Sequence, residues 1–137
     1  MFTISKEFHF SASHVLGGLP EDHPCSRLHG HNYVVIVHLQ AEDLDSVGMI
    51  QDYRDLEPIK KFIDEEWDHR HLNEKMCLDY HKNPIHPKEI EDKGTYPMNP
   101  TAENMAYYLF TMFEKRFPMI KGFSVKETPK TTAYYGK

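Results

Sequence analysis

Cysteine, tryptophan and long hydrophobic runs are scarce in this chain of 137 residues. The chain has 2 Cys and 1 Trp. Its longest aliphatic run, residues 34–37, is far shorter than the ~20 residues that a membrane-spanning helix needs. Two cysteines make no disulfide framework, and the first residues lack the basic and apolar regions of a signal peptide. We therefore expect a cytoplasmic protein with no membrane partner.

An excess of positive charge is also absent. The chain has 16 Lys and Arg against 21 Asp and Glu, a formal net charge of −5, so we expect no nucleic-acid partner. Hydrophobic residues make up 39% of the chain and aromatic residues 12%, which excludes a disordered protein. The length fits a single domain over residues 1–137. Histidine, by contrast, is abundant at 10 residues, which directs attention to metal or proton chemistry.

Two stretches alternate with the period of a β-strand. In residues 2–14, one face carries Phe2, Ile4, Phe8, Phe10 and Ala12. In residues 29–41, one face carries Tyr33, Val35, Val37 and Leu39. A period of two predicts two strands, each with one buried face.

Two later stretches have the spacing of amphipathic helices. We expect Asp55 to cap the first, whose apolar stripe consists of Leu56, Ile59, Phe62, Ile63 and Trp67. We expect Thr101 to cap the second. Residues 123–128 and 131–135 are predicted as two further strands. The order ββααββ predicts an α+β fold, in which an antiparallel four-stranded sheet carries two helices on one face.

The buried faces of the first two strands end in histidines. The register of the first strand continues to His14, and that of the second runs back to His31 and His29. Side chains at i and i+2 of a strand point the same way, so the three imidazoles can converge. Three imidazoles with one open position are typical of a catalytic Zn²⁺ site. The alternative is that each histidine is a surface or capped residue.

Cys25 precedes His29 by four residues, and its spacing leaves three interpretations open. It can close the metal site as a fourth ligand, act as a base or nucleophile beside a cation, or be inert. Glu127 continues the buried register of the third predicted strand. A carboxylate there needs a cationic or donor-rich partner, unless the strand turns outward and leaves it solvated.

Asp68 and His69 follow the first predicted helix. A carboxylate beside an imidazole suits proton transfer, provided that the chain bends at the helix end. His71 is a rival for the same role, and an exposed pair without function is the other alternative.

These residues, in this order, resemble the 6-pyruvoyltetrahydropterin synthase family, and within it the 6-carboxy-5,6,7,8-tetrahydropterin synthases of queuosine biosynthesis. The resemblance covers nearly the whole chain. Its most specific element is the segment Cys25-x-x-x-His29-Gly30-His31-Asn32-Tyr33. Further matching segments are 10–14, 48–53, 68–73, 99–104 and 126–128.

The resemblance implies a tunnelling fold, in which subunit sheets join into a barrel, commonly a homohexamer with active sites at subunit interfaces. It implies zinc on the three histidines and Glu127 as the anchor for the pterin. Cys25 would accept a proton, and His69, oriented by Asp68, would complete the relay. The implied lyase converts 7,8-dihydroneopterin triphosphate to 6-carboxy-5,6,7,8-tetrahydropterin, acetaldehyde and triphosphate.

Other features leave the assignment open. Thr101 and Arg27 are further candidates for substrate binding, Arg27 as an anion partner. Residues 74–98 are longer than the corresponding link of close relatives, and an insertion there can reshape a pocket wall or a subunit contact. The alternatives are the pyruvoyl-forming reaction, a zinc hydrolase and a non-catalytic zinc-stabilised oligomeric module.

Overall fold

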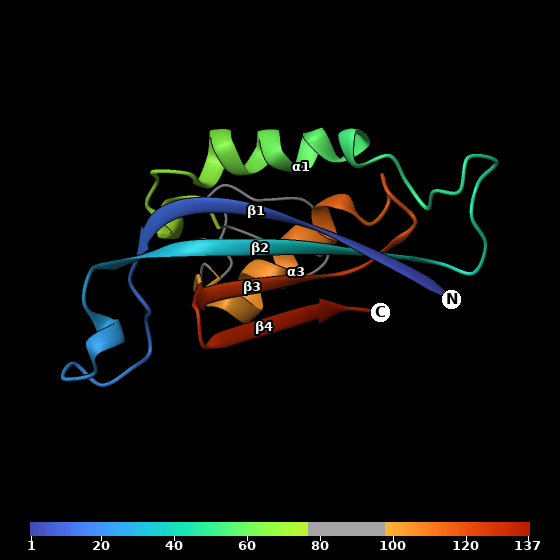
Figure 1. The fold of residues 1–137 in the computed structure, drawn as a ribbon. Helices are drawn as coiled ribbons and strands as arrows, with labels where there is room; N and C mark the ends of the chain where they lie inside the picture. The colour runs from blue at the N-terminus through green and yellow to red at the C-terminus, as the bar shows by residue number, and fades with distance from the viewer. Residues whose placement is uncertain (77–97) are drawn as a thin grey trace.

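The structure is a computed structural model that describes residues 1–76 and 98–137 (Figure 1). The predicted insertion at 74–98 therefore lies, apart from its ends, outside the described residues. Within the two described ranges, no helix is long and apolar enough to cross a lipid bilayer.

A four-stranded antiparallel sheet in the order β1-β2-β3-β4 organises the chain (Figure 1). The strands are β1 (Phe2–His14), β2 (His29–Ala41), β3 (Ile120–Thr128) and β4 (Thr131–Gly136). The long hairpin of β1 and β2 pairs over its full length, with Phe2 opposite Ala41 and His14 opposite His29. The predicted strands are confirmed, although β3 begins at Ile120 rather than at residue 123.

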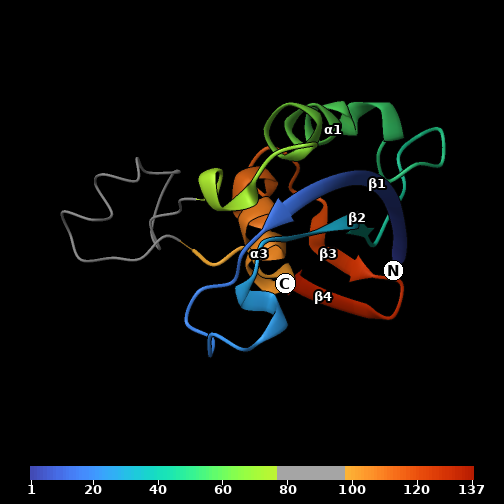
Figure 2. The ribbon, with the colours of Figure 1, turned by 90° about the vertical axis from the view of Figure 1, so that its left-hand side faces the viewer.

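The helices lie on one side of this sheet (Figures 1 and 2). Helix α1 (Glu57–Phe62) continues into a π-helical turn (Ile63–Trp67) that packs on β1. Helix α3 (Ala102–Phe113) packs on β3 and β4. The described residues place no helix on the opposite face. This arrangement confirms the α+β class and the two helices on one face.

The hydrophobic core fills the space between the sheet and the helices. Phe8 and Phe10 face inward from β1, and the Phe10 ring lies 5.7 Å from that of Trp67, which is fully buried. Four residues of the apolar stripe predicted for the first helix are buried: Leu56, Ile59, Ile63 and Trp67. Each such burial stabilises the fold by about 1.5–3 kcal/mol. Phe2, predicted on the buried face, is 49% exposed because it lies at the outer end of β1.

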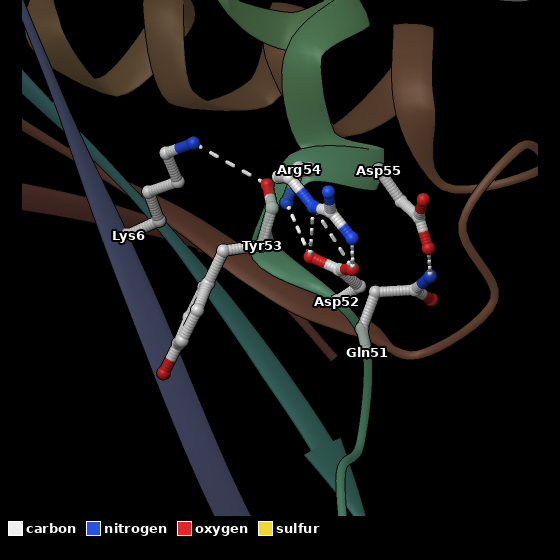
Figure 3. Close-up of polar contacts among 6 residues, drawn as sticks. All are labelled: Lys6, Gln51, Asp52, Tyr53, Arg54 and Asp55. Atoms are coloured by element: carbon white, nitrogen blue, oxygen red, sulfur yellow. Dashed lines mark hydrogen bonds and ion pairs between the residues drawn. The ribbon is translucent and has the colours of Figure 1, made fainter.

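The start of α1 differs from the prediction that Asp55 caps it. A 3-10 turn, Tyr53–Leu56, precedes the helix, and the Asp52 carboxylate accepts the backbone N–H of Arg54 at 2.9 Å (Figure 3). Asp55 instead accepts a hydrogen bond from the Gln51 amide at 2.6 Å. The extra turn moves the capping position upstream to Asp52.

The start of α3 agrees with the prediction. The Thr101 hydroxyl accepts the backbone N–H of Asn104 at 3.2 Å, as an N-cap does. Just before it, the Asn99 side chain makes two hydrogen bonds, of 2.9 and 2.8 Å, with the backbone of Gly17. These contacts fix the start of α3 against the loop between β1 and β2.

Candidate metal centre and the adjoining pocket

Three imidazoles meet where β1 ends and β2 begins. Nitrogen atoms of His14, His29 and His31 lie within 4.8 Å of one another. The register of the hairpin produces this convergence, because His14 lies opposite His29 and Ala12 opposite His31. His14 is fully buried, and the other two are half-buried. The structure thus brings together the three predicted ligands, in positions where they can hold a metal ion.

Backbone carbonyls orient two of these rings. His14 Nδ1 lies 2.8 Å from the Pro100 carbonyl oxygen, and His29 Nδ1 lies 2.7 Å from that of Arg27. A carbonyl only accepts, so each Nδ1 carries the proton and each Nε2 keeps a lone pair. The two Nε2 atoms face each other at 2.8 Å. Converging lone pairs repel each other unless a proton or a metal ion lies between them, and this donor set fits a divalent metal such as zinc.

Burial keeps two of these imidazoles in the neutral, metal-binding form. Burial lowers the pKa of His14, and neighbouring His29 and His31 lower it further, although the Pro100 carbonyl opposes this. Burial also lowers the pKa of His31, while the negative charge of Glu127 acts in the opposite direction. Neutral imidazole binds a metal without first losing a proton.

Glu127 lies near the end of β3, within electrostatic reach of His31 and Tyr33. Its charge acts on His31 and also on Tyr33, whose pKa is raised first by burial and then by this carboxylate. Glu127 is half-buried, and it has no hydrogen-bond or ion-pair partner in the described part of the chain. A half-buried carboxylate without a partner suits a ligand that offers donors.

A sharp bend after the π-helical turn brings Asp68 and His69 together. Asp68 is extended, and His69 has a φ of 58°, which is unfavourable for any residue but glycine. His69 Nδ1 lies 2.9 Å from Asp68 Oδ1. The same carboxylate accepts the backbone N–H of Ser11 at 3.1 Å, and this hydrogen bond is the main cause that lowers the pKa of Asp68. The bend that this pair requires is therefore present.

A pocket of about 500 Å³ is lined by residues of this bend and by His31. Its polar lining includes Ser13, His31, Asn32, His69, Arg70 and His71. His71 Nδ1 lies 3.0 Å from the Ser13 hydroxyl, so His71 is held against β1, whereas the His69 side chain is 82% exposed. Both candidates for the proton relay, His69 and His71, thus line the same pocket as His31, a predicted metal ligand.

The other predicted residues surround this centre. Cys25 is half-buried in the 3-10 turn Pro24–Ser26, and among the described residues its sulfur is not part of the cluster of metal-ligand atoms. Arg27 reaches the centre through its carbonyl oxygen rather than its guanidinium. Thr101 is occupied as the cap of α3, next to the Pro100 carbonyl that orients His14.

Sequence patterns missed three of these features. Two of them are the backbone carbonyls of Pro100 and Arg27, which orient His14 and His29. Every residue has a backbone carbonyl, so no sequence pattern marks these two. Arg70 could have been noticed as a cation between two histidines.

The fold and the centre together define a class: a single antiparallel sheet with a candidate three-histidine metal centre at its strand ends. The 6-pyruvoyl tetrahydropterin synthase family matches residues 3–137, and the chain belongs to this enzyme family. This confirms the resemblance.

Relatives from two bacteria are named 6-carboxy-5,6,7,8-tetrahydropterin synthase. The one from Haemophilus influenzae is 32% identical over 98% of this chain and 99% of its own. The one from Rickettsia felis is 31% identical over 94% and 96%. The solved 6-pyruvoyl tetrahydropterin synthase of Caenorhabditis elegans matches with a TM-score of 0.72 and 26% identity, over 99% of this chain and 95% of that one.

Proposed function

We propose that this chain is a zinc-dependent 6-carboxy-5,6,7,8-tetrahydropterin synthase of queuosine biosynthesis. It converts 7,8-dihydroneopterin triphosphate and one water molecule to the 6-carboxy product, acetaldehyde and triphosphate. The observation that carries the proposal is the convergence of the three imidazoles, one of which, His31, also lines a pocket with His69. Relatives with this name that match nearly the full chain support it.

In this proposal the three histidines hold zinc. Zinc bound there is a Lewis acid that lowers the pKa of the hydroxyl groups on the substrate side chain. Cys25 accepts a proton from the substrate, and Glu127 accepts hydrogen bonds from the amino-pyrimidine edge of the pterin. Thr101 and Arg27 provide additional substrate contacts.

Asp68 positions His69 for proton transfer. Because the Asp68 carboxylate accepts from His69 Nδ1, the other ring nitrogen is left to take up a proton. The hydrogen bond from Ser11 keeps Asp68 ionised, so it stabilises the imidazolium that forms. The pair therefore moves protons at the second face of the substrate.

The proposal extends to the assembly. We propose a single cytoplasmic domain that forms a homohexamer, whose sheets join into barrels with active sites at subunit interfaces. Strands β1 and β4 are the two edges of the sheet, and an edge strand can pair with another chain. The exposed His69 ring is suited to a site completed by a second subunit.

Product analysis tests this function. The purified zinc-containing protein is incubated with 7,8-dihydroneopterin triphosphate, and the products are identified by mass spectrometry. We expect 6-carboxy-5,6,7,8-tetrahydropterin and acetaldehyde. A 6-pyruvoyl product, which the names of the family and of the Caenorhabditis elegans structure favour, would replace the proposal by that activity. No pterin turnover despite bound zinc would leave a hydrolase or a non-catalytic oligomeric module.

A further inference from the structure

The free edge of β1 continues into the segment that follows the strand. Within β1, the Ser11 carbonyl and the Ser13 N–H point to this edge and pair with the backbone of residues 69–70, at 2.7 and 3.1 Å. Alternate residues of an extended chain present their N–H and C=O groups to the same edge. Val15 and Gly17, which follow β1, present theirs to this edge as well.

Two asparagine side chains pair with these backbone groups. Asn73 Oδ1 accepts the Val15 N–H at 2.9 Å, and Asn73 Nδ2 donates to the Val15 carbonyl at 2.8 Å. Asn99 makes the same two contacts with Gly17, at 2.9 and 2.8 Å. A side-chain amide offers both a donor and an acceptor, so it can replace a peptide group in a strand pair. The two amides thus hold segment 15–17 along one edge.

The backbone group between these two residues contacts Cys25. The Leu16 N–H donates to the Cys25 carbonyl at 2.9 Å. In the described part of the chain, the other hydrogen bonds of the loop that carries Cys25 run within residues 20–27 or to His29. The Leu16–Cys25 contact therefore attaches this loop to the segment after β1.

Segment 15–17 is also where other parts of the candidate site meet. It directly follows His14. Asn99 directly precedes the residue whose carbonyl orients the His14 ring at 2.8 Å. Asn73 follows the bend of residues 68–71, which carries the proposed proton relay. The two asparagines therefore tie these parts of the site to one short segment.

We propose that Asn73 and Asn99 are positioning residues for the thiol of Cys25. By holding segment 15–17 along one edge, they maintain the contact between Leu16 and Cys25. The inference rests on the proposed function, in which Cys25 accepts a proton from the substrate. A base works only within hydrogen-bond reach of the proton that it takes, so a small displacement of its loop lowers turnover. Neither asparagine contacts the substrate in this role.

Amide hydrogen exchange tests this positioning without catalysis. Residue-resolved exchange, read by mass spectrometry, compares the zinc-containing wild type with Asn73→Ala and Asn99→Ala. Gln51→Ala is the matched control, since the Gln51 amide makes a local hydrogen bond to Asp55. Each asparagine variant should speed exchange of the Leu16 amide about tenfold, although neither asparagine contacts that amide, and the control should exchange as the wild type does.

Isosteric variants keep the test valid if an alanine variant does not fold, which circular dichroism checks. Asn73→Asp and Asn99→Asp keep the size of the side chain but lose the N–H donor, so they should also speed exchange of the Leu16 amide. Exchange of Leu16 that is unchanged in the folded variants would overturn the positioning role.

Turnover with and without the thiol provides the second measurement. With 7,8-dihydroneopterin triphosphate, Asn73→Ala and Asn99→Ala should each lower kcat about tenfold, with KM and zinc content unchanged. Added to Cys25→Ala, neither should cause a further loss, because an effect that acts through the thiol disappears with it. A further loss of the full size would overturn the positioning role even where the 6-carboxy product forms. Leu16 exchange that depends on both asparagines, in a protein that makes no pterin product, would retain the attachment of the Cys25 loop and overturn the proposed function instead.

Discussion

The two ends of the β1–β2 hairpin differ in where most of the partners of their polar groups come from. At the end near Phe2, the adjoining segment 51–55 pairs mainly with itself, as Asp52 does with Arg54 at 2.8 Å, and its Tyr53 carbonyl also accepts from Lys6 of β1 at 3.3 Å (Figure 3). At the end near His14, most partners come from distant parts of the chain, Pro100 for His14 and residues 68–71 for β1, while His29 keeps a local partner in Arg27.

This difference separates local structural pairing from a site prepared for a ligand. The exposed local pairs already have their partners, and such pairs contribute little to stability. Within residues 1–76 and 98–137, the histidine end instead has a Glu127 carboxylate and an Arg70 guanidinium without ion-pair partners, and two imidazole Nε2 atoms that face each other at 2.8 Å. The buried and half-buried groups among these, the imidazoles and Glu127, are suited to a bound ligand.

The most severe way to break the histidine end is to remove one imidazole. In His29→Ala, two ring nitrogens remain, too few to retain zinc, and we expect product formation to fall below detection. Elemental analysis by mass spectrometry should find about one zinc per wild-type chain and almost none in the variant. Circular dichroism checks the fold, because His29 lies at a strand end. Full zinc content in the variant would contradict the proposed ligand set.

Removing the Cys25 thiol should separate chemistry from metal binding. In Cys25→Ala we expect a full complement of zinc and a fall in product formation of about a thousandfold, as for loss of a general base. Zinc content and product yield are measured on the same preparation. Equal loss of zinc and activity would instead indicate that Cys25 is a ligand, and unchanged activity would favour a hydroxide mechanism.

Asp68→Asn should have a smaller effect, with a defined pH dependence. Losing the carboxylate that orients His69 should lower turnover about a hundredfold, with zinc retained. The pKa of Asp68 is lowered in the folded state, so its stabilisation is full above the ordinary value of 3.8 and is lost as the pH falls through the folded pKa. Urea unfolding should show the variant less stable by about 1 kcal/mol at pH 7. If the difference in unfolding free energy between wild type and variant were as large at pH 3 as at pH 7, the lowered pKa of Asp68 would not be its cause.

The smallest effect is expected at the opposite end. Arg54→Ala breaks an ion pair that is largely exposed, so thermal unfolding, zinc content and turnover should all match the wild type. A loss of activity in this variant would show that segment 51–55 also contributes to the active site, and the two ends of the hairpin would then not differ in function.

Much of this could be predicted because alternation in a strand fixes side-chain direction. The faces of β1 and β2 followed from the period of two, and so did the convergence of His14, His29 and His31. The cap at Thr101 followed from local chemistry. The start of α1 did not, because an additional 3-10 turn moved the cap from Asp55 to Asp52. The pocket at Arg70 also could not be predicted, since it depends on how residues 68–71 dock on the edge of β1.

The left-handed backbone at His69 sets a trade-off between robustness and activity. A residue with a side chain loses about 1 kcal/mol in that conformation, whereas glycine does not. Selection for heat resistance alone would favour glycine at this position, and selection for turnover would retain the imidazole. A more thermostable variant of this enzyme should therefore keep His69 and carry its stabilising substitutions at the opposite end of the hairpin.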